Sequence, residues 1–327
     1  MATQRHAKKY PVFRNWFAGP NTPLTEDDLR VNEITRRAVI ENVIDAVQSF
    51  YLDPAAATRI ANALQSRLSD GTYDNVADAN TLARTLTSTL QELSGDKHFR
   101  CLFGISPDEP SVEDQVQQLT KLQYGFGEVK RLDGNIAVVE ITGFVPVHWH
   151  GVRERVDGIL SSVSNADALI IDLRRNRGGD PKTVALVASY LREEPTLWLR
   201  TFNPADGSSE EFVAERPLKS SGSGQNKLII VITSSESISG GEDLSYGLQA
   251  RKRATVVGEK TAGAANMPFH CVLEGSFLLS VPHKQVVHPV TGSSWEGVGV
   301  IPDIEVPAGE AFERALEIVR EEIRKGE

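Results

Sequence analysis

Four serines lie in one short segment that could carry a nucleophile, between an apolar run and a helix-like stretch. A serine at the point where a loop enters a helix has its hydroxyl beside backbone N–H groups that no helical carbonyl accepts. The same position suits an N-cap, and Ser239 with Glu242 has the spacing of a capping box. Residue types alone do not separate the four serines, and one residue can be both a cap and a nucleophile. The segment contains Ser234, Ser235, Ser237, Ser239 and the glycines Gly240 and Gly241.

A second segment could stabilise negative charge, because Gly178 and Gly179 stand between another apolar run and another helix-like stretch. Paired glycines let the chain turn tightly and leave their N–H groups unobstructed. Such groups can line an oxyanion hole or an anion nest. The alternative is a tight strand-to-helix turn in which Asp172 and Asn176 bond the backbone.

Two further segments hold groups for proton transfer. His98 follows Gly95, where a helical pattern gives way to a strand-like one, and Glu296 precedes a glycine-lined turn into another strand. Taken singly, a lone histidine is more often structural, and an acid beside a flexible turn is more often only exposed. His148 and His150 lack a carboxylate at matching spacing, so we expect no metal site and no cofactor.

The overall charge argues against two kinds of partner. The 327 residues include 35 Lys and Arg against 44 Asp and Glu, so the formal charge is −9 at pH 7. Nucleic-acid binders and proteins that dock on anionic membranes need a basic surface. No apolar run approaches the roughly 20 residues of a membrane-spanning helix. We expect neither nucleic acid nor membrane as a partner, and the oligomeric state stays open.

The compartment is indicated by the first residues and the cysteines. The basic residues near the N-terminus are not followed by the apolar run of a secretory signal, which predicts a cytoplasmic protein for the sequence as written. Cys101 and Cys271 have neither the number nor the spacing of a disulfide framework or a zinc site. Both are expected to be reduced thiols in the core.

Three helical patterns precede the chemistry-bearing segments. Residues 1–24 show no hydrophobic period and predict an N-terminal arm, whereas 25–96 predict a helical bundle subdomain. Asp53-Pro54 has the cap and first-turn proline of a helix start, and Gly95 suits a C-cap. The expected helices cover 25–51, 54–68 and 78–93.

Residues 97–327 alternate apolar runs with helical patterns, which predicts an α/β core. Two runs, Ala168–Leu173 and Leu228–Thr233, are almost wholly apolar, as in strands buried on both faces. The glycine and serine segments follow these runs, at the carboxyl ends of strands where layered α/β proteins bind ligands. The expected strands are 98–103, 124–130, 136–141, 168–173, 228–233, 254–258, 276–281 and 300–306, and the expected helices are 111–122, 147–162, 181–192, 239–251 and 308–325.

Together the motifs resemble one family of serine peptidases, over about Arg30 to Lys325. The family comprises the tail-specific or C-terminal processing peptidases, the tricorn core peptidase and the modules of interphotoreceptor retinoid-binding protein. The resemblance implies an α/β fold with a layered, crotonase-like ββα core and an N-terminal three-helix subdomain. The matching motifs are GDKHFR, IIDLRRNRGGD, ITSSESISGGED, ATVVGEKTAG and EGVGVIPDIEV, in that order.

The resemblance also implies roles for individual residues. The family places its nucleophile three residues before an acid at the helix start, which selects Ser239. In the tricorn peptidase a histidine near the start of the core is the base, and His98 matches it. Glu296 matches the glutamate that completes the tricorn site. The glycine loop would supply part of the oxyanion hole, formed by Gly178, Gly179 and Gly240.

Two departures from the tail-specific branch point to the tricorn and retinoid-binding-protein branch. Ala264 stands where the tail-specific branch has its lysine base, and Lys260 falls four residues early. Only 70 positions separate His98 from Ala168, too few for the PDZ domain that the tail-specific branch inserts there. Lys97 replaces the serine that precedes the tricorn histidine, so the resemblance leaves a fourth catalytic member and the role of Lys97 open.

These observations leave two classes of function and a third alternative. The first is a serine-type peptidase or related acyl hydrolase that forms an acyl-enzyme on a peptide or small acyl substrate. The second is a non-catalytic module that binds an apolar ligand such as a retinoid or fatty acid. The third is a biosynthetic enzyme that uses the same pocket for another reaction. Fold alone does not decide among them.

Overall fold

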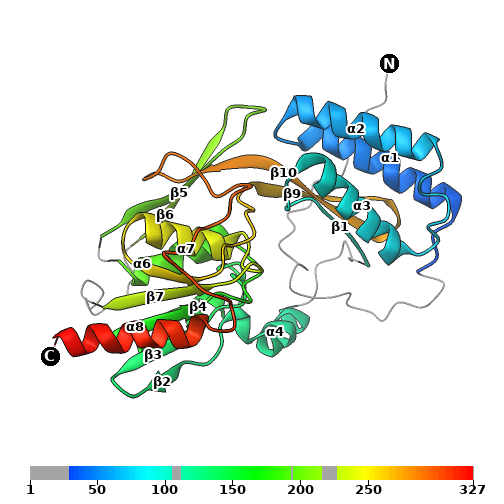
Figure 1. Cartoon of the computed structure of the whole chain (residues 1–327). Helices are drawn as coiled ribbons and strands as arrows, with labels where there is room; N and C mark the ends of the chain where they lie inside the picture. The colour runs from blue at the N-terminus through cyan, green and yellow to red at the C-terminus, as the bar shows by residue number, and fades with distance from the viewer. Residues whose placement is uncertain (1–28, 105–111, 193, 216–226, 327) are drawn as a thin grey trace. The chain divides into compact units, whose positions relative to one another are not determined.

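The computed structural model describes residues 29–104, 112–192, 194–215 and 227–326 (Figure 1). The chain forms two compact units. Unit 1 comprises residues 1–111, 202–208 and 266–285, and unit 2 comprises residues 112–201, 209–265 and 286–327. The predicted arm, residues 1–24, lies outside the described residues. The predicted boundary at 96/97 stays a prediction. Unit 1 holds the residues before that boundary together with residues 97–111 and two later segments.

Unit 1 begins with the three helices that the sequence predicts. They are α1 (Glu33–Phe50), α2 (Pro54–Ser69) and α3 (Ala79–Ser94). α1 starts later than expected, because the side chain of Asn32 caps it by accepting the N–H of Thr35 at 2.8 Å. Gly95 ends α3 in the left-handed conformation, with φ of 76°, as predicted for a C-cap.

A small antiparallel sheet completes unit 1. In it β1 (Arg100–Phe103) and β9 (Met267–Val272) both pair with β10 (Phe277–Val287). Apolar side chains of the three helices and of this sheet form one buried cluster. Cys101 and Cys271 are unpaired and buried in it, as the sequence predicts. The cluster fixes the end of α3 against the start of β1, which is where His98 stands.

Unit 2 is built on a six-stranded sheet in the order β11-β8-β7-β4-β3-β2. All neighbours are parallel except β2, which runs antiparallel to β3. The central strands are buried on both faces, as their continuous apolar sequences predict. The strands are β2 (Lys130–Leu132), β3 (Ile136–Glu140), β4 (Ala168–Asp172), β7 (Leu228–Thr233), β8 (Thr255–Gly258) and β11 (Ile304–Glu305).

Helices cover this sheet. Helix α8 (Ala311–Gly326) packs Ala311, Ala315 and Val319 on a face of the sheet that includes Ile170 and Ile230. Among the described residues, no helix is long and apolar enough to cross a membrane. Two strands outside the sheet, β5 (Thr196–Phe202) and β6 (Ser209–Ala214), pair with each other. The helices are α4 (Val112–Lys121), α5 (Val152–Ser162), α6 (Pro181–Tyr190), α7 (Gly240–Ala250) and α8 (Ala311–Gly326).

The fold class is mixed α/β, as predicted, but some elements differ from the expectation. The strand expected over 124–130 is wrong, because the short helical turn η1 (Gln123–Gly125) occupies its start, with Tyr124 at φ 56°. β5, β6 and β9 were not expected. In β6 the exposed residues Ser209, Glu211 and Val213 alternate with half-buried or buried ones, and β9 contains Pro268 and His270, so neither strand has a long apolar run.

Candidate active site

Ser239 occupies the N-cap of α7, directly after the turn that follows β7. Its backbone has φ 55° and ψ −113°, a conformation that residues other than glycine rarely adopt. Such a conformation costs on the order of 1–3 kcal/mol and persists only where the surroundings impose it. A strained serine on a strand-to-helix turn is the arrangement that exposes a nucleophile beside free helix N–H groups.

The structure separates the four serines that residue types left equivalent. The hydroxyl of Ser237 is buried and donates to the carbonyl of Leu173 at 2.8 Å. The hydroxyl of Ser234 donates to the carbonyl of Arg174 at 2.6 Å. Both serines therefore tie the turn after β7 to the segment after β4 that leads into Gly178 and Gly179. Ser239 alone among the four stands at the cap of α7.

The carboxylate of Glu242 holds the backbone around Ser239. It is fully buried and accepts the Ser239 N–H at 2.8 Å and the Ala264 N–H at 2.9 Å on one oxygen. Its other oxygen accepts the Thr261 hydroxyl at 2.5 Å and the Gly263 N–H at 2.6 Å. Burial raises the pKa of Glu242, and the four hydrogen bonds oppose that shift. The expected capping contact from Glu242 to the N-cap is present.

The glycine loop after β4, which carries Gly178 and Gly179, lies against the turn that follows β7. A Cβ at Gly178 would lie 2.8 Å from the Cβ of Ser239, and one at Gly179 would lie 2.1 Å from the carbonyl oxygen of Phe144. Both glycines have left-handed φ, 88° and 136°. Only glycine satisfies both the conformation and the close approach. The chemistry-bearing loops of β4 and β7 are therefore in direct contact within unit 2.

Asn176 links the two loops. It is fully buried, its amide donates to the carbonyl of Ile141 at 2.9 Å, and its oxygen accepts the Gly178 N–H at 2.8 Å. The N–H of Gly178 is thus occupied. Within the described residues the structure gives the N–H groups of Gly179 and Gly240 no acceptor. These bonds match the alternative interpretation of the glycine segment, a tight strand-to-helix turn in which Asn176 bonds the backbone.

Residues 261–265 brace the other side of Glu242. Ala264, which the resemblance aligns with the tail-specific lysine, is buried, and its carbonyl accepts the indole N–H of Trp295 at 2.9 Å. The carboxylate of Glu296 accepts the Ala265 N–H at 2.6 Å. Glu296 thus belongs to unit 2 and is tied to the segment that Glu242 also holds. The side chain of Lys260 is exposed.

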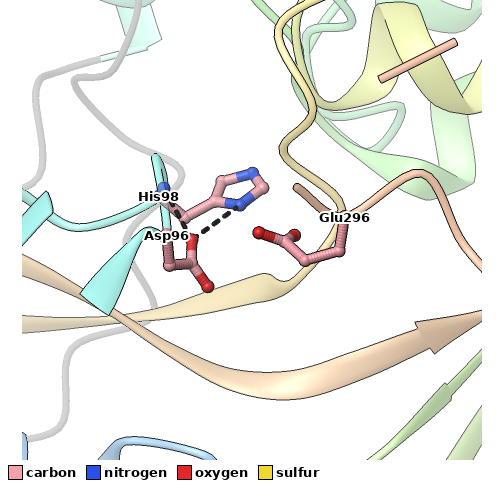
Figure 2. Close-up of side chains that lie close together, drawn as sticks. All are labelled: Asp96, His98 and Glu296. Atoms are coloured by element: carbon pink, nitrogen blue, oxygen red, sulfur yellow. Dashed lines mark hydrogen bonds and ion pairs between the residues drawn. The ribbon is translucent and has the colours of Figure 1, made fainter. Parts of the chain in front are cut away.

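His98 belongs to unit 1 and has a carboxylate beside it that sequence analysis did not select. Figure 2 shows Asp96 and His98 side by side on the turn between α3 and β1. Oδ1 of Asp96 accepts the His98 N–H at 2.8 Å and lies 3.6 Å from Nδ1 of the ring. Both side chains are buried. The usable signal in the sequence was a carboxylate two residues before a histidine on a tight turn.

Comparison with known families decides the relationship. The model of peptidase family S41 matches residues 135–306. The chain belongs to peptidase family S41. A second family model, described as the N-terminal domain of peptidase S41 in eukaryotic IRBP, matches residues 33–126. The predicted membership of this family of serine peptidases is confirmed, and both parts of the chain contribute to it.

Individual relatives agree with the S41 membership. The tail-specific protease of Haemophilus influenzae is 28% identical over 211 residues, 61% of this chain and 28% of the relative. The carboxy-terminal-processing protease of Bartonella bacilliformis is 24% identical over 208 residues, 62% of this chain and 45% of the relative. The chain thus spans less than half the length of these relatives. The crystal structure of the tricorn protease shares the fold, with a TM-score of 0.56 over 89% of this chain and 37% of that one, at 15% identity.

Proposed function

We propose that the chain is a serine-type peptidase that acts through an acyl-enzyme on Ser239. The observation that carries the proposal is the placement of Ser239 itself. It is a strained N-cap residue whose Cβ lies 2.8 Å from the Cβ position of Gly178, so a nucleophile and an oxyanion-binding loop share one location. Membership of the S41 family supplies the reaction class.

In this proposal His98 is the general base. Its ring takes the proton of the Ser239 hydroxyl as the oxygen attacks the scissile carbonyl, and returns that proton to the leaving amine. Water then cleaves the ester by the same steps. The N–H groups of Gly179 and Gly240 would stabilise the oxyanion, with Gly178 contributing the space that a side chain would fill.

Glu296 supports the active segment in the proposal. Its hydrogen bond to the Ala265 N–H holds residues 261–265, which carry two of the N–H groups bound by Glu242. We propose a positioning role for Glu296, so Glu296→Gln is expected to weaken turnover less than loss of Ser239. The proposed substrate is a peptide, as the names of the two relatives imply for those proteins.

The test is turnover of a fluorogenic peptide library by Ser239→Ala, His98→Ala and the double variant. Each single variant is expected to lose turnover, and the double variant should lose no more than either, because both changes disable one device. Thermal unfolding checks that all three variants fold. Multiplicative losses would contradict a shared mechanism. A folded wild-type protein that cleaves nothing but binds a retinoid or fatty acid would favour the binding-module alternative.

A further inference from the structure

The side chain of Asp96 is held in one orientation by two hydrogen bonds. Its Oδ1 accepts the backbone N–H of His98 at 2.8 Å, and its Oδ2 accepts the amide of Asn266 at 2.9 Å. All three residues belong to unit 1. A carboxylate that is almost fully buried is costly unless its oxygens are bound in this way. The oxygen that accepts the His98 N–H is also the one that faces Nδ1 of the imidazole ring.

That oxygen lies 3.6 Å from Nδ1 of His98. The separation is longer than a hydrogen bond, but catalytic contacts in ligand-free proteins are often long and tighten in the complex with substrate. At this separation a buried negative charge favours the tautomer that carries its proton on Nδ1. It also stabilises the imidazolium that forms when the ring takes a second proton.

A neighbouring histidine is not a substitute for this carboxylate. His270 in β9 donates to or accepts from Ser280 at 2.8 Å through Nδ1. Burial, followed by the charges of His98 and His283, lowers the pKa of His270 to about 4. His270 is therefore neutral at neutral pH and places no charge beside His98, so the charge next to the ring within unit 1 is that of Asp96.

We propose that Asp96 is the positioning residue of the catalytic base. It fixes the ring of His98 with the proton on Nδ1, so that Nε2 is the atom that accepts the proton of the Ser239 hydroxyl. The inference rests on the proposed function for its catalytic consequence, and on unit 1 alone for its geometry. Asp96 was not among the residues that the family resemblance selected.

The first readout is spectroscopic. In protein labelled with ¹⁵N-histidine, the ring nitrogen shifts report which nitrogen of a neutral imidazole carries the proton, and a His98→Gln variant assigns the signal. Wild-type protein is expected to show the Nδ1–H tautomer. Asp96→Asn should shift the population toward Nε2–H. Retention of the Nδ1–H tautomer in Asp96→Asn would overturn the proposal.

The second readout separates positioning from structural support. Asp96→Asn should lower kcat by about 10²–10⁴-fold while changing KM far less, because the lost interaction acts on proton transfer. The double variant Asp96→Asn/Asn266→Asp restores a hydrogen bond within the pair but moves the charge to the side away from Nδ1. It should recover stability to unfolding without recovering kcat. Joint recovery of stability and kcat would show a structural role and overturn the proposal.

The controls keep failure of this inference apart from failure of the proposed function. Asp53→Asn removes another carboxylate that accepts backbone N–H groups in unit 1 and should leave both the tautomer and kcat unchanged. If Asp96→Asn does not fold alone, the double variant carries the same tautomer prediction. If wild-type protein has no turnover, the proposed function fails, and the tautomer measurement still decides whether Asp96 orients His98.

Discussion

At the scale of single residues, Glu242 gives the sharpest structural prediction. Its two carboxylate oxygens accept four hydrogen bonds. Three come from the backbone N–H groups of Ser239, Gly263 and Ala264, and the fourth comes from the Thr261 hydroxyl. In Glu242→Gln the NH₂ group replaces one of the two oxygens. Two of the four donors would then lie opposite another donor and lose their acceptor. We expect a loss of about 3 kcal/mol in the free energy of unfolding, measured by urea denaturation, together with a loss of turnover.

Glu259 provides the matched control for that prediction. It also accepts two backbone N–H groups in unit 2, those of Ser235 and Ala308, and these bonds lower its pKa. Neither of these two donors belongs to Ser239 or to residues 261–264. Glu259→Gln should lower the free energy of unfolding by less than Glu242→Gln does. It should also leave the reaction of Ser239 with a fluorophosphonate probe unchanged. Equal effects from both variants would contradict a special role of Glu242.

At the scale of elements, a buried polar network joins α7 to β5. The indole N–H of Trp198 donates to Asp243 at 2.9 Å, and the guanidinium of Arg251 lies 4.7 Å from the centroid of the Trp198 ring. Arg251 also bonds the carbonyls of Leu197 and Trp198, and it contacts His288. Asp243 directly follows Glu242, so the network supports α7, the helix whose N-cap is Ser239.

The network predicts a pH dependence of stability. Burial raises the pKa of Asp243 to about 7, against the Trp198 hydrogen bond and the Arg251 charge. Between about pH 4 and pH 7 the folded protein keeps a proton that the unfolded chain, with a pKa near 3.9, releases. The protonated Asp243 side chain therefore contributes to stability at low pH, and this contribution is lost as the pH rises through 7. Relative to Asp243→Asn, wild type should lose about 1–3 kcal/mol between pH 5 and 8, by urea denaturation.

His288 should show the opposite sign and serves as the internal check. Burial, with the Arg251 charge, lowers its pKa to about 4, so the unfolded chain binds the extra proton below about pH 6.5. Wild type should lose stability relative to His288→Gln as pH falls from 7 to 5. Parallel curves for wild type and both variants would contradict the account of this network.

The glycine loop gives a second prediction for elements. Gly179→Ala would place a Cβ 2.1 Å from the Phe144 carbonyl oxygen at φ 136°, which requires the glycine loop or the Phe144 backbone to shift. We expect a loss of more than about 3 kcal/mol in unfolding free energy and loss of turnover. Gly158→Ala, in the middle of α5 with nothing within 4 Å of the new Cβ, should instead stabilise by about 0.5–1 kcal/mol. A Gly179→Ala protein as active as Gly158→Ala would refute the crowded loop.

At the scale of the whole molecule, the sequence predicted the elements with strong local signals. The apolar runs of β4 and β7 and the capped helices α2 and α3 appear close to their expected ranges. The two loops after those strands meet in unit 2, because adjacent parallel strands place their carboxyl ends together. The family resemblance and the S41 model agree on this part of the chain.

The parts that the sequence did not predict depend on tertiary contacts. β5 and β6 have only short apolar stretches, Leu197–Leu199 in β5 and Phe212–Ala214 in β6, and their pairing with each other identifies them as strands. The carboxylate of Asp96 is oriented by a hydrogen bond from the amide of Asn266, which lies 170 positions later in the sequence. Residue types alone left the four serines equivalent, and the family resemblance selected Ser239; the hydrogen bonds of the Ser234 and Ser237 hydroxyls to the carbonyls of Arg174 and Leu173 came only from the structure. None of these contacts is encoded by a local pattern.

The central claim is that Ser239 is an activated nucleophile, and one labelling experiment tests it most directly. Wild-type protein is treated with a fluorophosphonate probe, digested and mapped by mass spectrometry. The account predicts a single adduct on Ser239, absent in Ser239→Ala and strongly slowed in His98→Ala, because the phosphonyl group reacts only with a serine whose proton has an acceptor. No adduct on folded wild-type protein, or an adduct on Ser234, Ser235 or Ser237 instead, would contradict it.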